Sequence, residues 1–177
     1  VSIWSKYPII RCVTLPSADR KRTVAALLDI GGGKELIVYG TVMPWHSDQG
    51  ENPAEAKTVN WSEHNRVVPM QCAEWAELQR LHPNALLCVA GDYNTDMGTG
   101  SRYGTKEGIA ALVEGLGRCG LFCATSPGYV PAGKLAALPI DHIALPLAWA
   151  KSAAVVAAWP AFKGIVSDHS GLIVEVE

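Results

Sequence analysis

The sequence has 177 residues, of which 49% are hydrophobic and 18% are charged, and its formal net charge is −2. This composition predicts one well-buried domain and excludes both a disordered chain and a coiled coil. The near-neutral charge excludes a protein that holds nucleic acid by bulk positive charge, although a nuclease needs only a local basic path to its substrate.

Targeting signals are not evident in the sequence. The most apolar region, residues 143–162, is interrupted by Pro146, Lys151 and Pro160, which excludes a membrane span. The first residues lack the basic and apolar regions of a secretory signal. The five cysteines have no zinc-type spacing, and we interpret them as reduced core residues of a cytoplasmic protein.

Short apolar runs separated by turn residues predict a strand-rich chain. Apolar residues spaced three and four apart predict one helix that includes Val68 and Leu81, and a second over residues 106–118. We expect a single mixed α/β domain over residues 1–177. The predicted strands are residues 1–4, 9–15, 23–30, 35–42, 85–90, 121–124, 138–144, 153–158 and 172–176.

Three of the apolar runs end in an acidic residue, namely Asp92, Asp141 and Asp168. Acids at the ends of buried strands bring carboxylates together at one rim of a sheet, and such oxygen ligands suit Mg²⁺. Each acid taken alone is explained as well by a turn or a helix cap, because aspartate is common there. The combination of the three acids and their order along the chain favour a metal site over three unrelated turns.

The motifs Gly91-Asp92-Tyr93-Asn94, Ile140-Asp141-His142-Ile143 and Ser167-Asp168-His169-Ser170 resemble, in this order, those of the endonuclease/exonuclease/phosphatase superfamily. Residues 1–8 and 38–44 also resemble family strands, so the likeness spans nearly the whole chain. The resemblance implies the deoxyribonuclease-I-like fold, an α/β (α+β) architecture. In that fold two packed, mainly antiparallel β-sheets are flanked by helices in a four-layer αββα sandwich.

The resemblance also implies roles for the motif residues. Asp92 would activate or orient the attacking water, and Asn94 would hold a phosphate oxygen. Asp141 would orient His169, which would face the phosphate, and Asp168 would bind Mg²⁺ or Mn²⁺ together with Asp92 and Asn94. A carboxylate beside a histidine favours its charged form, which suits the stabilisation of a phosphoryl transition state.

Loop residues are candidates for substrate contact. His46 and Arg102 lie in predicted loops near the motifs, and an exposed loop residue is the open alternative for both. Thr41 stands roughly where relatives often have tyrosine or histidine. The basic run Arg20-Lys21-Arg22 is interpreted as a solvated turn, and His64 as a surface residue.

The family pattern also includes a metal-binding glutamate before the segment that here begins at Val1. We therefore expect a domain that is N-terminally truncated, with an open sheet edge that favours a homodimer. Two functions follow. One is a divalent-metal-dependent phosphoesterase acting on a phosphate ester, with nucleic acid among the candidate substrates. The other is a binding or structural module that has lost turnover together with the glutamate.

Overall fold

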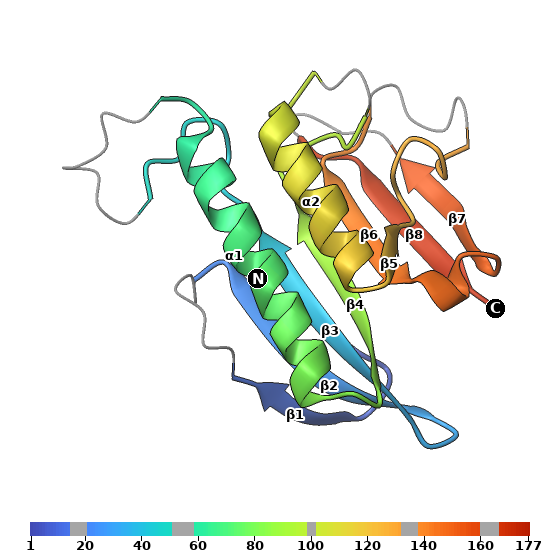
Figure 1. The fold of residues 1–177 in the computed structure, drawn as a ribbon. Helices are drawn as coiled ribbons and strands as arrows, with labels where there is room; N and C mark the ends of the chain where they lie inside the picture. The colour runs from blue at the N-terminus through green and yellow to red at the C-terminus, as the bar shows by residue number, and fades with distance from the viewer. Residues whose placement is uncertain (15–20, 51–58, 99–101, 132–137, 160–166) are drawn as a thin grey trace.

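The computed structural model describes residues 1–14, 21–50, 59–98, 102–131, 138–159 and 167–177. Its centre is a six-stranded sheet with the strand order β1-β2-β3-β4-β6-β5 (Figure 1). The pair β3–β4 is parallel and the other pairs are antiparallel, so the sheet is mixed. The strands are β1 (Ile9–Val13), β2 (Thr23–Gly31), β3 (Lys34–Val42), β4 (Ala85–Asp92), β5 (Leu121–Cys123) and β6 (Asp141–Pro146).

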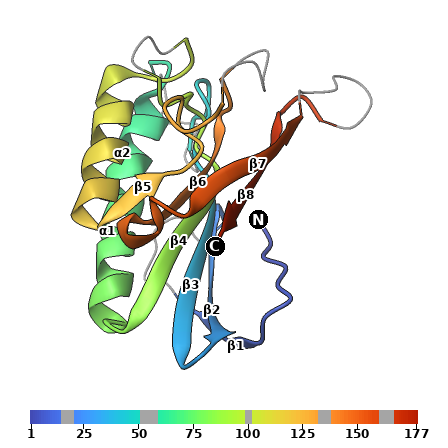
Figure 2. The same cartoon turned by 90° about the vertical axis from the view of Figure 1, so that its right-hand side faces the viewer.

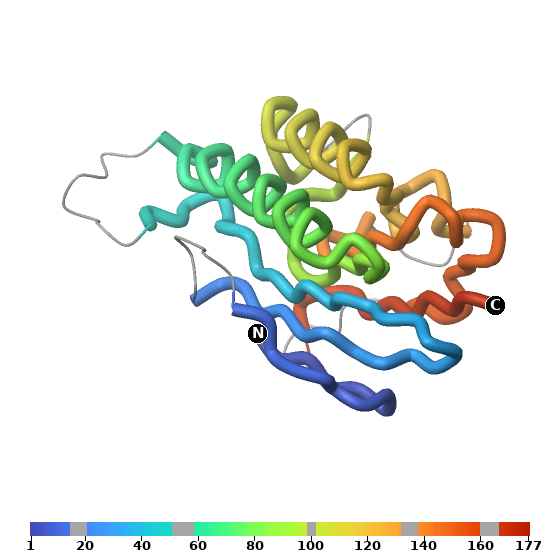
Figure 3. The backbone as a smooth tube through the Cα atoms, turned by 60° about the horizontal axis from the view of Figure 1, so that its bottom comes forward, coloured from blue at the N-terminus to red at the C-terminus, as the bar shows by residue number. Residues whose placement is uncertain are grey.

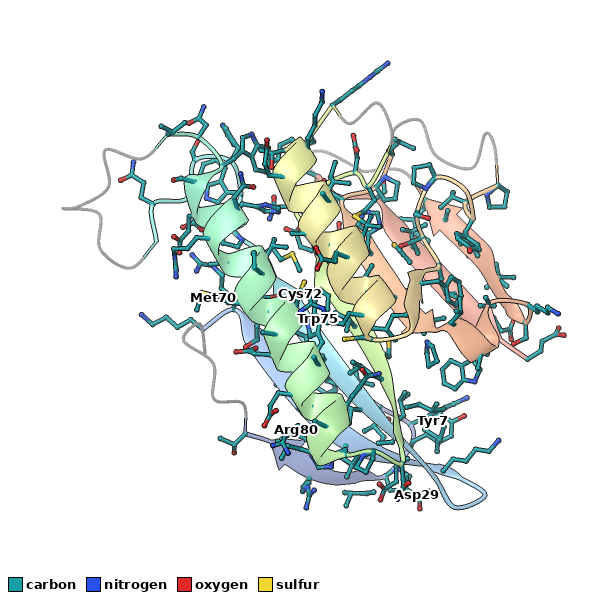
Figure 4. The ribbon with its side chains drawn as sticks, in the orientation of Figure 1. Tyr7, Asp29, Met70, Cys72, Trp75 and Arg80 are labelled. Atoms are coloured by element: carbon teal, nitrogen blue, oxygen red, sulfur yellow. The ribbon has the colours of Figure 1, made fainter. Side chains whose placement is uncertain are left out.

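Two helices, α1 (Ser62–Leu81) and α2 (Lys106–Arg118), lie side by side on one face of this sheet (Figure 3). Figure 4 shows Cys72 and Trp75 on the side of α1 that faces α2 and the sheet. The Trp75 ring lies edge-on to Tyr39 of β3, with ring centroids 6.1 Å apart. A Cβ at Gly115 of α2 would overlap the Cys72 side chain, so glycine permits the close approach of the two helices.

The opposite face of the sheet carries a second, two-stranded sheet made of β7 (Ala153–Trp159) and β8 (Gly171–Val176). A short 3₁₀ helix (Leu147–Trp149) connects β6 to it. Side chains alternate along β4, so Leu87 and Val89 join the core under the helices while Cys88 packs toward Val174 and Val176. Figure 2 shows the helices, the large sheet and the small sheet as three successive layers.

The expected sandwich is therefore present in part. Helices cover one face of a large sheet and a small antiparallel sheet lies on the other, but the large sheet is mixed. The described residues contain no helix on the outer side of the small sheet, so they form three of the four expected layers.

The prediction of a strand over residues 1–4 is wrong. This segment takes no part in the strand pairings of the described residues. Val1 and Ile3 instead pack their side chains near Gly40 of β3, on the sheet face opposite the helices. An apolar run becomes a strand only when a neighbouring strand accepts its hydrogen bonds, and the apolar side chains of residues 1–4 are used for packing across the sheet.

Four of the five cysteines are buried, as expected, whereas Cys12 is exposed. Cys12 lies on β1, an edge strand whose residues are almost all exposed. None of the helices in the described part of the chain is long and apolar enough to cross a membrane.

His142 of β6 is a buried structural histidine, 1% exposed. Its Nε2 donates to the Thr95 carbonyl oxygen at 2.8 Å, and its Nδ1 lies 3.0 Å from Thr125 Oγ1, from which it accepts. Burial disfavours the imidazolium and lowers the pKa of His142 to about 4. The folded protein therefore contains neutral His142 at neutral pH.

We expect this histidine to make stability depend on pH. The unfolded chain binds the proton with a pKa near 6.5 and the folded chain only near 4, so stability falls as the pH drops through this window. The loss from His142 amounts to about 3 kcal/mol at pH 4. Urea unfolding at several pH values measures it, with His142→Gln as the non-titrating control. Equal pH dependence in both proteins would contradict the assignment.

Candidate active site

The site is assembled from the end of β4, the start of β6 and the turn before β8. Asp92 and Asp141 are directly opposite partners in the antiparallel β4–β6 pairing, so their side chains emerge next to each other. His169, just before β8, places its Nδ1 2.7 Å from Asp141 Oδ2. Ligand atoms of Asp92, Asp141 and His169 all lie within 4.8 Å of one another.

The backbone conformation of Gly91 explains why a glycine precedes Asp92. Its φ is 141°, a conformation that side-chain-bearing residues rarely adopt, and a Cβ there would overlap the backbone carbonyl of Thr41 on β3. The Met43 backbone N–H then donates to the Asp92 carbonyl oxygen at 2.8 Å. Close contact between β3 and β4 therefore fixes the backbone position of Asp92.

Asn94 holds the Asp92 carboxylate. Its backbone N–H donates to Asp92 Oδ1 at 2.8 Å, and its Nδ2 donates to Asp92 Oδ2 at 3.0 Å and to the Met43 carbonyl at 2.8 Å. Asn94 has a φ of 49°, and asparagine is one of the few residues that tolerate this left-handed conformation. In this arrangement Asn94 orients Asp92.

The two halves of the site have different electrostatics. The pKa of Asp92 is raised to about 6, because burial and the nearby Asp141 charge raise it by more than the hydrogen bonds from Asn94 and the His169 charge lower it. Burial works to lower the pKa of His169, but the surrounding carboxylates, Asp141 foremost and then Asp92 and Asp168, together outweigh it, so the pKa is raised. Near neutral pH the site thus favours an imidazolium beside Asp141, while Asp92 is largely ionised.

A cleft of about 690 Å³ opens in front of these groups. Its lining includes Asp92, Asn94 and His169 together with Trp45 and Arg22. A second hollow of about 390 Å³ lies on the Asp141 side of His169, next to β8. The catalytic candidates therefore stand where two hollows meet.

The other sequence-predicted residues lie around this centre. Asp168 lines the cleft with a side chain that is 78% exposed, and its Oδ1 is 4.0 Å from His169 Nε2. His46 packs between Trp45 and Trp61, with ring centroids 5.0 and 6.0 Å away. Arg102 is exposed outside the lining of the cleft, and its backbone N–H donates to Asp96 at 2.8 Å.

Arg22 was missed by the sequence analysis, which treated its basic run as a solvated turn. In the structure Arg22 donates to both carboxylate oxygens of Asp48, at 2.8 and 3.0 Å, and lines the cleft. A signal was available: Arg22 immediately precedes β2, which runs antiparallel to β3, so it lies beside the end of β3. That end is on the same rim as Asp92, because β3 and β4 are parallel.

Two further polar residues are buried rather than exposed. His64 is 0% exposed and bonds to the Tyr93 carbonyl oxygen at 3.0 Å, so its interpretation as a surface residue is wrong. Thr41 donates to Gln71 of α1 at 2.8 Å, so it supports the sheet–helix contact beneath the site. Local polarity did not reveal either, because both are buried by contacts between distant segments.

The donor set fits a hard divalent cation. The carboxylates of Asp92 and Asp141 converge on a partly buried rim, and the burial of Asp92 beside Asp141 leaves two like charges that a cation would neutralise. The cluster combines Asp92 with Asp141 and His169, whereas the resemblance implied Asp92 with Asn94 and Asp168. Asn94 Nδ2 is already engaged with Asp92 and Met43.

Solved structures with this arrangement of elements are known. The chain is similar to a 3′–5′ exonuclease from Neisseria meningitidis, with TM-score 0.62 and 15% identity over 98% of this chain and 73% of that one. It is similar to the human nocturnin catalytic domain, with TM-score 0.55 and 13% identity over 97% of this chain and 60% of that one. It is also similar to a beta toxin from Staphylococcus aureus with bound magnesium ions, with TM-score 0.54 and 16% identity over 98% of this chain and 66% of that one.

These matches show the fold. The chain has the deoxyribonuclease-I-like fold, as its motifs predict, and another similar structure is an endonuclease/exonuclease/phosphatase from Beutenbergia cavernae. It spans 60% of the nocturnin domain and 73% of the Neisseria exonuclease. No protein-family model and no curated protein matches the sequence.

Proposed function

We propose that the chain is a divalent-metal-dependent phosphoesterase that hydrolyses a phosphate ester with an activated water, in the manner of a nuclease or phosphodiesterase. The observation that carries this proposal is the Asp141–His169 pair, 2.7 Å across, beside Asp92 at the mouth of a cleft. The matched structures include an endonuclease domain and an exonuclease, which supports nucleic acid as the substrate class.

Each residue has a task in this reaction. Asp92, held by Asn94, accepts a hydrogen bond from the attacking water and orients it toward phosphorus. His169, kept charged by Asp141, donates to a phosphate oxygen and stabilises the charge that develops there. A bound Mg²⁺ or Mn²⁺ would supply additional positive charge at the phosphate. Asp92 and Asp141 would hold that ion, and Asp168 extends the acidic rim.

Metal dependence is the direct test. Purified protein should hydrolyse a generic phosphodiester with Mg²⁺ or Mn²⁺, lose this activity in EDTA and regain it when the metal is restored. His169→Ala should lower the rate strongly and Asp168→Ala more weakly, because Asp168 is mostly exposed. Activity that persisted in EDTA and in both variants would refute the proposal.

A module that binds phosphate compounds without turnover is the second candidate. It is favoured by the small ligand set of the described site, which offers two carboxylates and one histidine. It predicts that the phosphodiester binds with measurable affinity while no metal-dependent hydrolysis occurs. A robust turnover rate that copurifies with the protein and disappears in His169→Ala would exclude it.

The proposal includes a homodimer formed through the small sheet. Among the described residues β8 pairs only with β7, so its other edge offers unpaired backbone groups. Val156 and Ile173 on this sheet are 45% and 47% exposed, which adds apolar area next to that edge. We expect light scattering to report twice the chain mass of 18.9 kDa for the unmodified protein. The Ile173→Lys variant should give a lower mass, because a charge at this apolar surface disfavours pairing. A monomer at micromolar concentration would contradict the pairing.

A further inference from the structure

A cluster of aromatic rings stands beside the candidate active site. It is defined by Trp45, His46, Trp61, His64 and Tyr103. Trp45 contacts His46 edge-on with ring centroids 5.0 Å apart, and Trp61 lies 5.0 Å from Tyr103 and 5.4 Å from His64. The Tyr103 hydroxyl donates to Asn94 Oδ1 at 3.4 Å, which joins the aromatic cluster to the residues that hold Asp92.

Trp45 is the outermost ring of the aromatic cluster. It is 49% exposed and lines the cleft together with Asp92 and His169, whereas His64 behind it is 0% exposed. A half-exposed indole in the wall of a polar cleft leaves apolar surface in water, and covering that surface with a flat apolar group is favourable.

The backbone around Trp45 is held in place. The Trp61 N–H donates to the His46 carbonyl at 2.8 Å, and the Asp48 N–H donates to the Trp45 carbonyl at 3.0 Å. The Asp48 carboxylate is in turn bound by Arg22 and by the Gly50 N–H. Trp45 therefore presents a positioned ring, which lowers the entropy that a ligand loses on binding.

The contents of the cleft indicate the chemistry of the ligand. Its volume of about 690 Å³ is far more than a bare phosphate fills, and it falls in the range of sites for small organic ligands. Its lining includes both the groups proposed to act on a phosphate and the indole of Trp45. A phosphate ester that carries a planar aromatic ring close to its phosphate would occupy both.

We infer that Trp45 is a stacking platform for the nucleobase next to the reacting phosphate, so that the substrate is a single-stranded nucleic acid or a nucleotide. This inference rests on the proposed phosphoesterase function and assigns its substrate class. Stacking of a base on an aromatic side chain is tolerant of base identity, because every base has a π-face. Lipid headgroups and inositol phosphates have no such face and would gain less from Trp45.

Binding measured without turnover tests this inference. A fluorescent single-stranded oligonucleotide with phosphorothioate linkages is titrated with the protein in EDTA, and ribose 5-phosphate competes as a probe that has the phosphate but no base. Trp45→Ala should weaken oligonucleotide binding about 5- to 150-fold, the equivalent of one lost base stack. Trp45→Phe should retain most of the affinity, and ribose 5-phosphate should compete equally well against all variants.

Trp4→Ala is the matched control, because Trp4 is 92% exposed and lies outside the lining of the cleft. It should bind like the unmodified protein. In kinetics Trp45→Ala should raise KM with little change in kcat, since stacking holds the substrate before and during reaction alike. Unchanged oligonucleotide affinity in Trp45→Ala, or an equal loss of ribose 5-phosphate binding, would overturn the inference.

The two proposals fail separately. If the protein hydrolyses a phosphodiester with Mg²⁺ but Trp45→Ala binds the oligonucleotide normally, the phosphoesterase stands and the stacking platform falls. If the protein binds the oligonucleotide through Trp45 but never hydrolyses it, the stacking platform stands and the phosphoesterase falls.

Discussion

Asp141→Asn is expected to lower kcat for phosphodiester hydrolysis by roughly 10²–10³-fold, the usual cost of losing one charge-stabilising group in a transition state. The Asp141 carboxylate accepts a 2.7 Å hydrogen bond from His169 and helps to raise its pKa. Asparagine keeps the size of the side chain but not its charge, so the imidazolium loses its partner. Steady-state kinetics at saturating Mg²⁺ measures the effect.

Glu114→Gln is the control for removing a carboxylate. Glu114 pairs with Arg118 on the outer side of α2 and its side chain is 73% exposed, far from the described site. The Glu114→Gln variant should leave kcat unchanged. The thermal midpoints of Glu114→Gln and Asp141→Asn should both stay within a few degrees of that of the unmodified protein. Full activity of Asp141→Asn would show that His169 needs no carboxylate partner. A collapse of its thermal midpoint would assign Asp141 a structural role instead.

Gly91→Ala is expected to destabilise the fold by about 2–6 kcal/mol. The φ of 141° and the overlap of a Cβ with the Thr41 carbonyl are separate penalties, each of about 1–3 kcal/mol. For a domain of this size the thermal midpoint should fall by roughly 4–24 °C. Calorimetry or urea unfolding measures it, and hydrolysis should decline as well because Asp92 follows directly.

Gly117→Ala provides a matched control for this substitution. Gly117 lies within α2 and a Cβ there would meet nothing within 4 Å. Alanine should therefore stabilise the protein by about 0.5–1 kcal/mol, since it is a better helix former. An equal response of the two glycines would contradict the steric argument for Gly91.

The fold could be predicted from the sequence where the pattern is local. The apolar spacing in α2 and the continuous run of β4 determine these elements within two residues, and the spacing from Val68 to Leu81 gives the end of α1 but not its start at Ser62. Residues 1–4 show the limit, because strand formation needs a partner that the local sequence does not specify. The burial of Gln71 could not be predicted from the local sequence either, since this polar side chain is satisfied by a hydrogen bond from Thr41 on another element.

The candidate site was predictable to the extent that it consists of short motifs. The acids at the ends of strands identified Asp92 and Asp141, and the register of β4 and β6 makes them neighbours. Trp45 could be named from the sequence only as a candidate for a hydrophobic wall, and the guanidinium of Arg22 was missed, because both reach the cleft from loops whose paths depend on tertiary contacts. Motif spacing carries no information about such a wall.

The Asp141–His169 pair joins the two sheets at the site, in addition to the apolar packing between them. Asp141 belongs to the six-stranded sheet, while His169 precedes a strand of the two-stranded one. The small sheet can in principle undock while the large sheet and its helices stay folded, as parts of proteins open independently. Each such opening would separate the carboxylate from the imidazole. Under the proposed function, docking of the small sheet is therefore a requirement for reaction, because it keeps Asp141 and His169 together.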